Sequence, residues 1–237
     1  MLSGIMKQMI VITDGHSNQG GSPVAAAERA WKAGIAASAV GILDSGQLGI
    51  KGAAEIKQIA KAGGGSYSFV TVRDLAHTLT CITVQATQAA VRQLADRKLL
   101  ELAGKSLNQL PPAVRSTILP YLAQKEEALE VHLALVVDTS GSMLEKRAEL
   151  ENSIKELLFN LDNRRGPVKL AVIQYPGISG DGALIKPLHI DNGVTLQVLQ
   201  QMVYGGFTPT GPAIDLAAGV LSGSRDIKGS NLVVSLK

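Results

Sequence analysis

The chain has 237 residues, of which 46% are apolar and 18% charged, so it can form a hydrophobic core and does not resemble a disordered chain. Its net charge is +3 with scattered basic residues, which argues against a nucleic-acid partner. Its single cysteine excludes an intrachain disulfide, and no apolar stretch reaches the roughly 18 residues of a membrane span. The apolar run at 9–12 is too short for the hydrophobic region of a signal peptide, so we expect a cytoplasmic protein.

Strands and helices alternate over the first 70 residues. The apolar, β-branched run 9–13 predicts a buried strand that ends at Asp14. Ser22 and Pro23 are typical of a helix start, and Gly34 is typical of a helix end. Further expected elements are a strand at 35–43, a helix at 52–62 and a strand at 66–70. This β-α-β-α-β order predicts a parallel sheet with crossover helices.

A long helical stretch follows from Asp74. Its apolar residues recur at spacings of three and four, which places on one face Leu75, Leu79, Ile82, Ala86 and Ala89. Gly104 interrupts this stretch, and a second helix is expected from Pro112 to about residue 129, with a kink at Pro120. We therefore expect residues 86–129 to form a helical connector between two α/β halves.

The second half of the chain again alternates between strands and helices. The most apolar strand, 131–137, ends at Asp138 and precedes an amphipathic helix. Strands at 168–175 and 184–190 are expected to form a hairpin at a sheet edge. The last expected elements are helices at about 195–202 and 211–221 and a strand at 231–236. The predicted fold class is a doubly wound, mostly parallel, Rossmann-like α/β sheet with an antiparallel edge strand.

Three loops are rich in oxygen ligands, and they lie at 13–15, 138–142 and 208–210. In an open parallel sheet, ligands bind beyond the carboxyl ends of the strands, where such loops converge. One interpretation is structural, in which Asp138 and Ser140 only cap the following helix. The chemical interpretation is a divalent cation held by oxygens. Because hydroxyl ligands carry no charge, such an ion stays electrophilic and can accept an anionic oxygen from a partner.

These loops resemble the metal-ion-dependent adhesion site of von Willebrand factor type A domains. The resemblance is carried by Asp138, Ser140, Ser142, Thr208 and Asp14, together with the flanking sequences GGFTPTGPAI and IVITDG. It implies that the two serines and the threonine bind Mg²⁺ or Mn²⁺ directly, and that the two aspartates act through water. It also implies a binding module without its own enzymatic activity, which captures an acidic residue of a partner protein.

The order of these motifs departs from that family, in which the DxSxS strand comes first and the TDG strand last. The chain resembles a circularly permuted A domain, similar to small intracellular A-domain proteins of bacteria. Residues 1–85 would be the C-terminal half, 130–237 the N-terminal half, and 86–129 the connector, which closes the chain at little entropic cost. The alternative is complementation of the halves between chains, in a domain-swapped or head-to-tail homo-oligomer.

Two further points follow from the sequence. The tail NLVVSLK resembles QMIVITD and aligns Lys237 with Asp14, so we expect Asp14 to complete the site and the tail strand to lie elsewhere. The alternative function is a Mg²⁺-dependent enzyme component, such as a chelatase-like or ATPase-associated subunit or a phosphoester hydrolase. Its candidate base or nucleophile would be His16, Ser17 or Asp215. A third interpretation is a purely structural domain.

Overall fold

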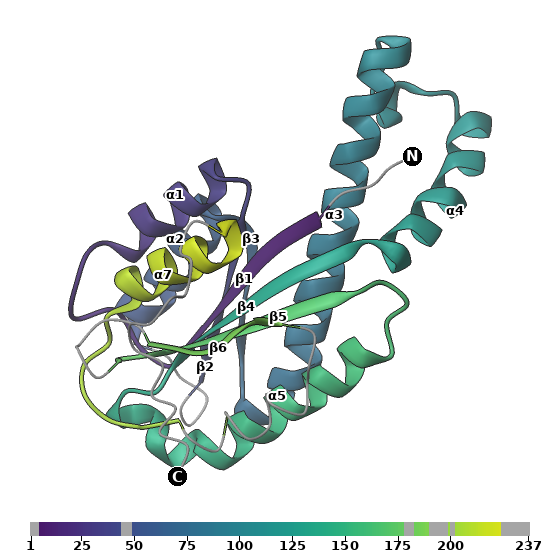
Figure 1. Ribbon diagram of the computed structural model, residues 1–237. Helices are drawn as coiled ribbons and strands as arrows, with labels where there is room; N and C mark the ends of the chain where they lie inside the picture. Colours follow the sequence, from purple (N-terminus) through teal and green to yellow (C-terminus); the bar gives the residue numbers. More distant parts are fainter. Residues whose placement is uncertain (1–4, 44–48, 178–182, 190–198, 200–201, 224–237) are drawn as a thin grey trace.

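Figure 1 shows the protein as a computed structural model, which describes residues 5–43, 49–177, 183–189, 199 and 202–223. Within these residues six strands form one sheet with helices on both faces. The strands are β1 (Ile5–Thr13), β2 (Ala36–Ile42), β3 (Gly64–Val70), β4 (Glu130–Asp138), β5 (Val168–Tyr175) and β6 (Ala183–His189). The α-helices are α1 (Pro23–Lys32), α2 (Ile50–Ala62), α3 (Leu75–Ala103), α4 (Pro112–Ala128), α5 (Arg147–Asp162) and α7 (Thr210–Ser222). Short 3₁₀ helices are η1 (Val72–Asp74), η2 (Leu107–Gln109) and η3 (Gly141–Lys146).

The sheet has the strand order β3-β2-β1-β4-β5-β6. The first five strands are parallel, and β6 runs antiparallel to β5 at the edge. The predicted doubly wound, mostly parallel α/β sheet is therefore confirmed. From the central pair β1 and β4 the chain proceeds outward in opposite directions, so the strand order reverses between these two strands. In such sheets the crevice at this reversal, beyond the carboxyl ends, is where ligands bind.

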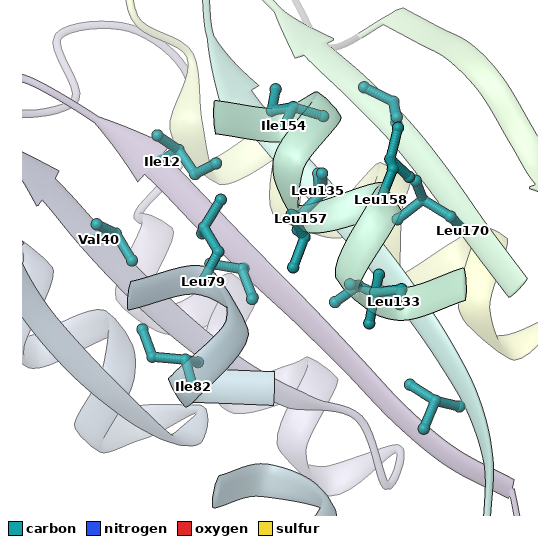
Figure 2. Packing of buried hydrophobic residues seen from close by; sticks show 14 of the residues in the cluster. Ile12, Val40, Leu79, Ile82, Leu133, Leu135, Ile154, Leu157, Leu158 and Leu170 are labelled. Atoms are coloured by element: carbon teal, nitrogen blue, oxygen red, sulfur yellow. The ribbon is translucent and has the colours of Figure 1, made fainter. Parts of the chain in front are cut away.

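The core lies in two layers, one on each face of the sheet. Strand β4 is buried along nearly its whole length because its side chains alternate between the two layers. Leu133 and Leu135 pack with residues of α3 and α5, including Leu79 and Leu157 (Figure 2). The other layer contains Val136 and side chains of α1, α2 and α7. Each such aliphatic side chain contributes about 1.5–3 kcal/mol when fully buried.

Helices α3 and α4 connect strand β3 to strand β4. Helix α3 runs without a break through residues 85 and 86 and ends at Gly104, whose φ of 63° suits glycine. Its later part and α4 extend beyond the sheet (Figure 1). Ala89, which the spacing places on the apolar face of this helix, is exposed. Thr83 and Thr87 are buried instead, since α3 also contacts α4 and α5, and both hydroxyls donate to carbonyls one turn earlier.

Some expected elements fall outside the described residues. The strand expected at 231–236 lies there entirely, and the helix expected at about 195–202 lies there for the most part. In the part of the chain that the structure describes, we find no helix that combines the length and the apolar character needed to cross a membrane.

Candidate metal centre

The carboxyl ends of the two central strands bring the predicted aspartates to the same edge of the sheet. Asp138 is the last residue of β4, and Asp14 directly follows β1, which pairs in parallel with β4 up to the pair Ile12 and Val137. After Asp138 the chain turns sharply into η3. The Ser140 backbone N–H donates to Asp138 Oδ1 at 2.9 Å, which fixes this turn.

A hydrogen-bonded path connects four of the five predicted ligands. Ser142 Oγ donates to Asp14 Oδ1 at 2.7 Å, and the Ser140 and Ser142 hydroxyls lie 3.3 Å apart. The bond from Ser140 N–H to Asp138 and the contact between the two serines join residues two positions apart, whereas the bond from Ser142 to Asp14 joins residues 128 positions apart. The structure therefore brings Asp14, Asp138, Ser140 and Ser142 together.

The fifth predicted ligand, Thr208, lies on a loop that is tied to both aspartate loops. Its backbone N–H donates to Asn18 Oδ1 at 2.8 Å, and its carbonyl accepts from the Asn18 N–H and the Ser17 hydroxyl. On the other side, the Gly205 N–H donates to the Thr139 carbonyl at 2.7 Å. Thr208 is buried, and the bonds that hold it are made by its main chain. Its loop is thus fixed between the β1 and β4 loops.

Asp138 is held in an unusual electrostatic environment. Its side chain is fully buried, and burial is the main cause that raises its pKa to about 6. Two donors oppose this shift, because the Thr13 hydroxyl donates to Oδ2 at 2.6 Å and the Ser140 N–H donates to Oδ1. The nearby charge of Asp14 adds to the upward shift. A buried carboxylate of this kind is costly to ionise and gains strongly from a nearby cation.

Sequence reasoning missed one charged residue at this site. The Lys146 ammonium lies 2.6 Å from Asp14 Oδ2 and 3.2 Å from the Ser142 carbonyl oxygen. Both charged side chains are buried, with 9% exposed for Lys146 and 2% for Asp14. The sequence spacing could have indicated this contact. Lys146 stands four residues after Ser142 on a helical segment, and residues one helical turn apart lie close together.

The donor set suits a hard divalent cation. Two carboxylates and three hydroxyls offer only oxygen atoms, which are the ligands that Mg²⁺ and Mn²⁺ prefer. Among the described residues, no three or more His, Cys, Asp or Glu side chains form a group that could hold a metal ion, so a nitrogen or thiolate site has no support there. The residues present therefore fit a cation held largely by hydroxyls, with one carboxylate, Asp14, also paired to Lys146.

This doubly wound sheet, with acidic and hydroxyl side chains at its central switch point, is similar to the von Willebrand factor type A domain. Residues 3–94 match the family model of the von Willebrand factor type A domain. The matched part includes Asp14 and ends before Asp138. This match supports a general role as a protein-interaction or metal-dependent module.

Two relatives match nearly the whole chain. The uncharacterised protein YabS of Bacillus subtilis (strain 168) is 29% identical over 216 residues, covering 90% of this chain and 88% of that protein. The crystal structure of an uncharacterised protein from Alicyclobacillus acidocaldarius subsp. acidocaldarius DSM 446 is 36% identical. That match covers 93% of this chain and 95% of the other, with a TM-score of 0.87. The same fold, in the same chain order, thus extends over nearly all of that molecule.

Proposed function

We propose that the protein is a divalent-metal-dependent binding module that captures an acidic residue of a partner protein. The observation that carries this proposal is the connected group of Asp14, Asp138, Ser140 and Ser142 at the switch point of the sheet. In this proposal Ser140, Ser142 and Thr208 bind Mg²⁺ or Mn²⁺ through their hydroxyls. Asp138 and Asp14 hold the ion through water. The ion supplies a Lewis-acidic position for an oxygen of the partner.

The charge balance of the group favours an anionic ligand. Three of the five proposed donors are neutral hydroxyls, and one of the two carboxylates is already paired with the Lys146 ammonium. A divalent ion in these surroundings keeps net positive charge, and burial strengthens its attraction for an anion. A carboxylate of a partner fits this requirement, because it brings one negative charge and a hard oxygen donor.

The surroundings of the site also suit a protein partner. Three large apolar side chains are exposed on the same loops: Leu144 at 57%, Val203 at 67% and Phe207 at 64%. Leu144 lies in η3, and the loop with Val203 and Phe207 adjoins the start of α5, since the Arg147 guanidinium lies 5.3 Å from the Tyr204 ring centre. Exposed apolar side chains on the segments around a polar site favour a protein interaction surface.

The order of the chain is part of the proposal. We propose that residues 1–85 and 130–237 form one A domain in permuted order, with 86–129 as the connector. Support comes from the parallel pairing of β1 with β4 and from the bond between Ser142 and Asp14, which both join the two halves. A monomer by size-exclusion chromatography with light scattering, retaining metal binding, is expected. A strictly dimeric protein that loses metal binding on dilution would favour exchange of halves between chains.

The alternative of a Mg²⁺-dependent enzyme has less support from the positions of its candidate groups. The Ser17 hydroxyl donates to the Thr208 carbonyl at 3.0 Å, and the Asp215 carboxylate accepts two bonds from Arg29. Both groups therefore have partners other than a reacting water or substrate. His16 lies on the exposed surface. A general base or nucleophile needs to face the ion and the substrate at hydrogen-bonding distance.

The proposal is tested by metal binding and then by selection of a carboxylate. Isothermal titration of the chelator-stripped protein with Mn²⁺ should show binding that is lost in the double variant Ser140→Ala, Ser142→Ala. The matched control Ser116→Ala, on α4, should bind as the wild type does. A displayed random-peptide library, selected in Mg²⁺ and eluted with chelator, should yield sequences with Asp or Glu. Equal metal binding by the double variant, or peptides that bind equally after Asp-to-Asn exchange, would refute the proposal.

A further inference from the structure

The ammonium of Lys146 occupies a position that the metal proposal does not explain. Lys146 is the last residue of η3, and its side chain is among the few buried cationic groups in the described part of the chain. Lysine is rarely buried unless its charge is compensated. Asp14 Oδ2 at 2.6 Å and the Ser142 carbonyl at 3.2 Å contribute to this compensation.

Both oxygens of the Asp14 carboxylate are engaged. Oδ1 accepts the Ser142 hydroxyl, and Oδ2 accepts the Lys146 ammonium. The ammonium therefore shares its carboxylate with the proposed cation site, and it also lies against Ser142, another proposed ligand. Two positive charges that share one buried carboxylate repel each other, and burial limits the screening of this repulsion by water.

We infer that Lys146 is a built-in competitor of the divalent ion for Asp14 and thereby sets the metal affinity of the site. The inference rests on the proposed function, because it concerns the same site. Without Lys146, the Asp14 carboxylate loses its 2.6 Å ion pair, and the repulsion between Asp14 and Asp138 is no longer offset by that pair. Lys146 thus stabilises the protein in the absence of metal and weakens its binding of metal. A site tuned in this way responds to the ion concentration, since an ion that binds more weakly is held only when it is abundant.

The test removes the charge of Lys146 and keeps the length of the side chain. Mn²⁺ and Mg²⁺ are titrated into the chelator-stripped full chain, and we expect Lys146→Met to bind at least about tenfold more tightly than the wild type. Lys146→Arg, which keeps the charge, should bind within a few-fold of the wild type. The matched control Lys61→Met removes an exposed charge on α2 and should leave the affinity unchanged.

A second background identifies the carboxylate through which Lys146 acts. In Asp14→Asn protein, the gain from Lys146→Met should fall to a few-fold or less, because the competition for Asp14 no longer exists. Far-ultraviolet circular dichroism confirms that each variant is folded before titration. Unchanged or weaker binding by Lys146→Met, beside a wild type that binds, overturns this inference and leaves the proposed function intact. Absence of binding by the wild type and by Lys146→Met refutes the proposed function itself.

Discussion

Replacing Asp138 by asparagine should stabilise the protein at neutral pH when metal is removed by a chelator. Burial raises the pKa of Asp138 from its usual value of 3.8 to about 6. Because the folded state binds the proton more tightly than the unfolded state, the stabilising contribution of protonation is fully present below about pH 4. It is lost as the pH rises through about 6. A shift of about two pKa units corresponds to about 3 kcal/mol, which is the cost of the ionised carboxylate at neutral pH.

Asparagine can keep both hydrogen bonds of this side chain. Its Oδ1 can accept the Ser140 N–H, which now lies 2.9 Å from Asp138 Oδ1. Its Nδ2 can donate to the Thr13 hydroxyl, which then turns its proton toward the Gly15 carbonyl at 3.4 Å. The substitution therefore removes the buried charge and retains the shape and the contacts, so nearly all of the electrostatic cost should be recovered.

The assay is equilibrium urea denaturation in chelator at two pH values. At about pH 7.5 the free energy of unfolding of Asp138→Asn should exceed that of the wild type by about 3 kcal/mol. At about pH 4.5 the difference should fall to about 1 kcal/mol, because the wild-type carboxylate is then largely protonated in the folded state. Mg²⁺ at about 100 times its dissociation constant should stabilise only the wild type, by about 2.7 kcal/mol, and so nearly cancel the advantage of the variant. A variant that is less stable at both pH values, or a difference that does not change with pH, would refute the reasoning.

Two further substitutions test contacts around the site by the same denaturation in chelator. Thr13→Val removes the 2.6 Å hydrogen bond to Asp138 and should cost about 1–3 kcal/mol at neutral pH, and equal stabilities would show that this bond contributes nothing. Gly211→Ala places a Cβ 2.2 Å from the Gly21 carbonyl oxygen, so α7 must move away from the loop before α1, at a cost of about 1–3 kcal/mol or more. Gly49→Ala, whose Cβ meets no atom within 4 Å, is the control for glycine replacement and should leave the unfolding midpoint nearly unchanged.

The fold could be predicted closely wherever local pattern and burial agree. Strand β5 has the predicted bounds, and α1 begins as expected, with Ser22 accepting from the Ala25 N–H. Strand β1 begins at Ile5, earlier than the predicted residue 9. The polar Lys7 and Gln8 interrupt the apolar pattern, and this interruption hides the true start of the strand in the sequence. Gln8 is nevertheless buried, where its amide donates to the Ser38 hydroxyl at 3.3 Å. This hydrogen bond to the neighbouring strand satisfies the amide nitrogen of Gln8, and no local sequence signal reveals it.

The site could be predicted in part for a related reason. A residue at the end of an apolar strand is recognisable from sequence, and parallel strands end at the same edge of the sheet, so Asp14 and Asp138 could be placed together. The contacts between the loops could not be predicted, because they join residues that are far apart in the chain. Examples of such long-range contacts are the ion pair between Lys146 and Asp14 and the hydrogen bond between Thr208 and Asn18.

The burial of Asp138 bears on the choice between a functional site and a helix cap. An aspartate that only fixed the turn into η3 could be replaced by asparagine, which keeps the bond from Ser140 and avoids a cost of about 3 kcal/mol. That cost is a large fraction of the roughly 5–15 kcal/mol by which a typical domain is stable. The buried Lys146 forms a 2.6 Å ion pair with Asp14, and its charge is not among the causes that shift the pKa of Asp138. A negative charge that is expensive for folding, held among hydroxyls at the switch point of the sheet, is understandable if a cation binds there and recovers the energy on binding.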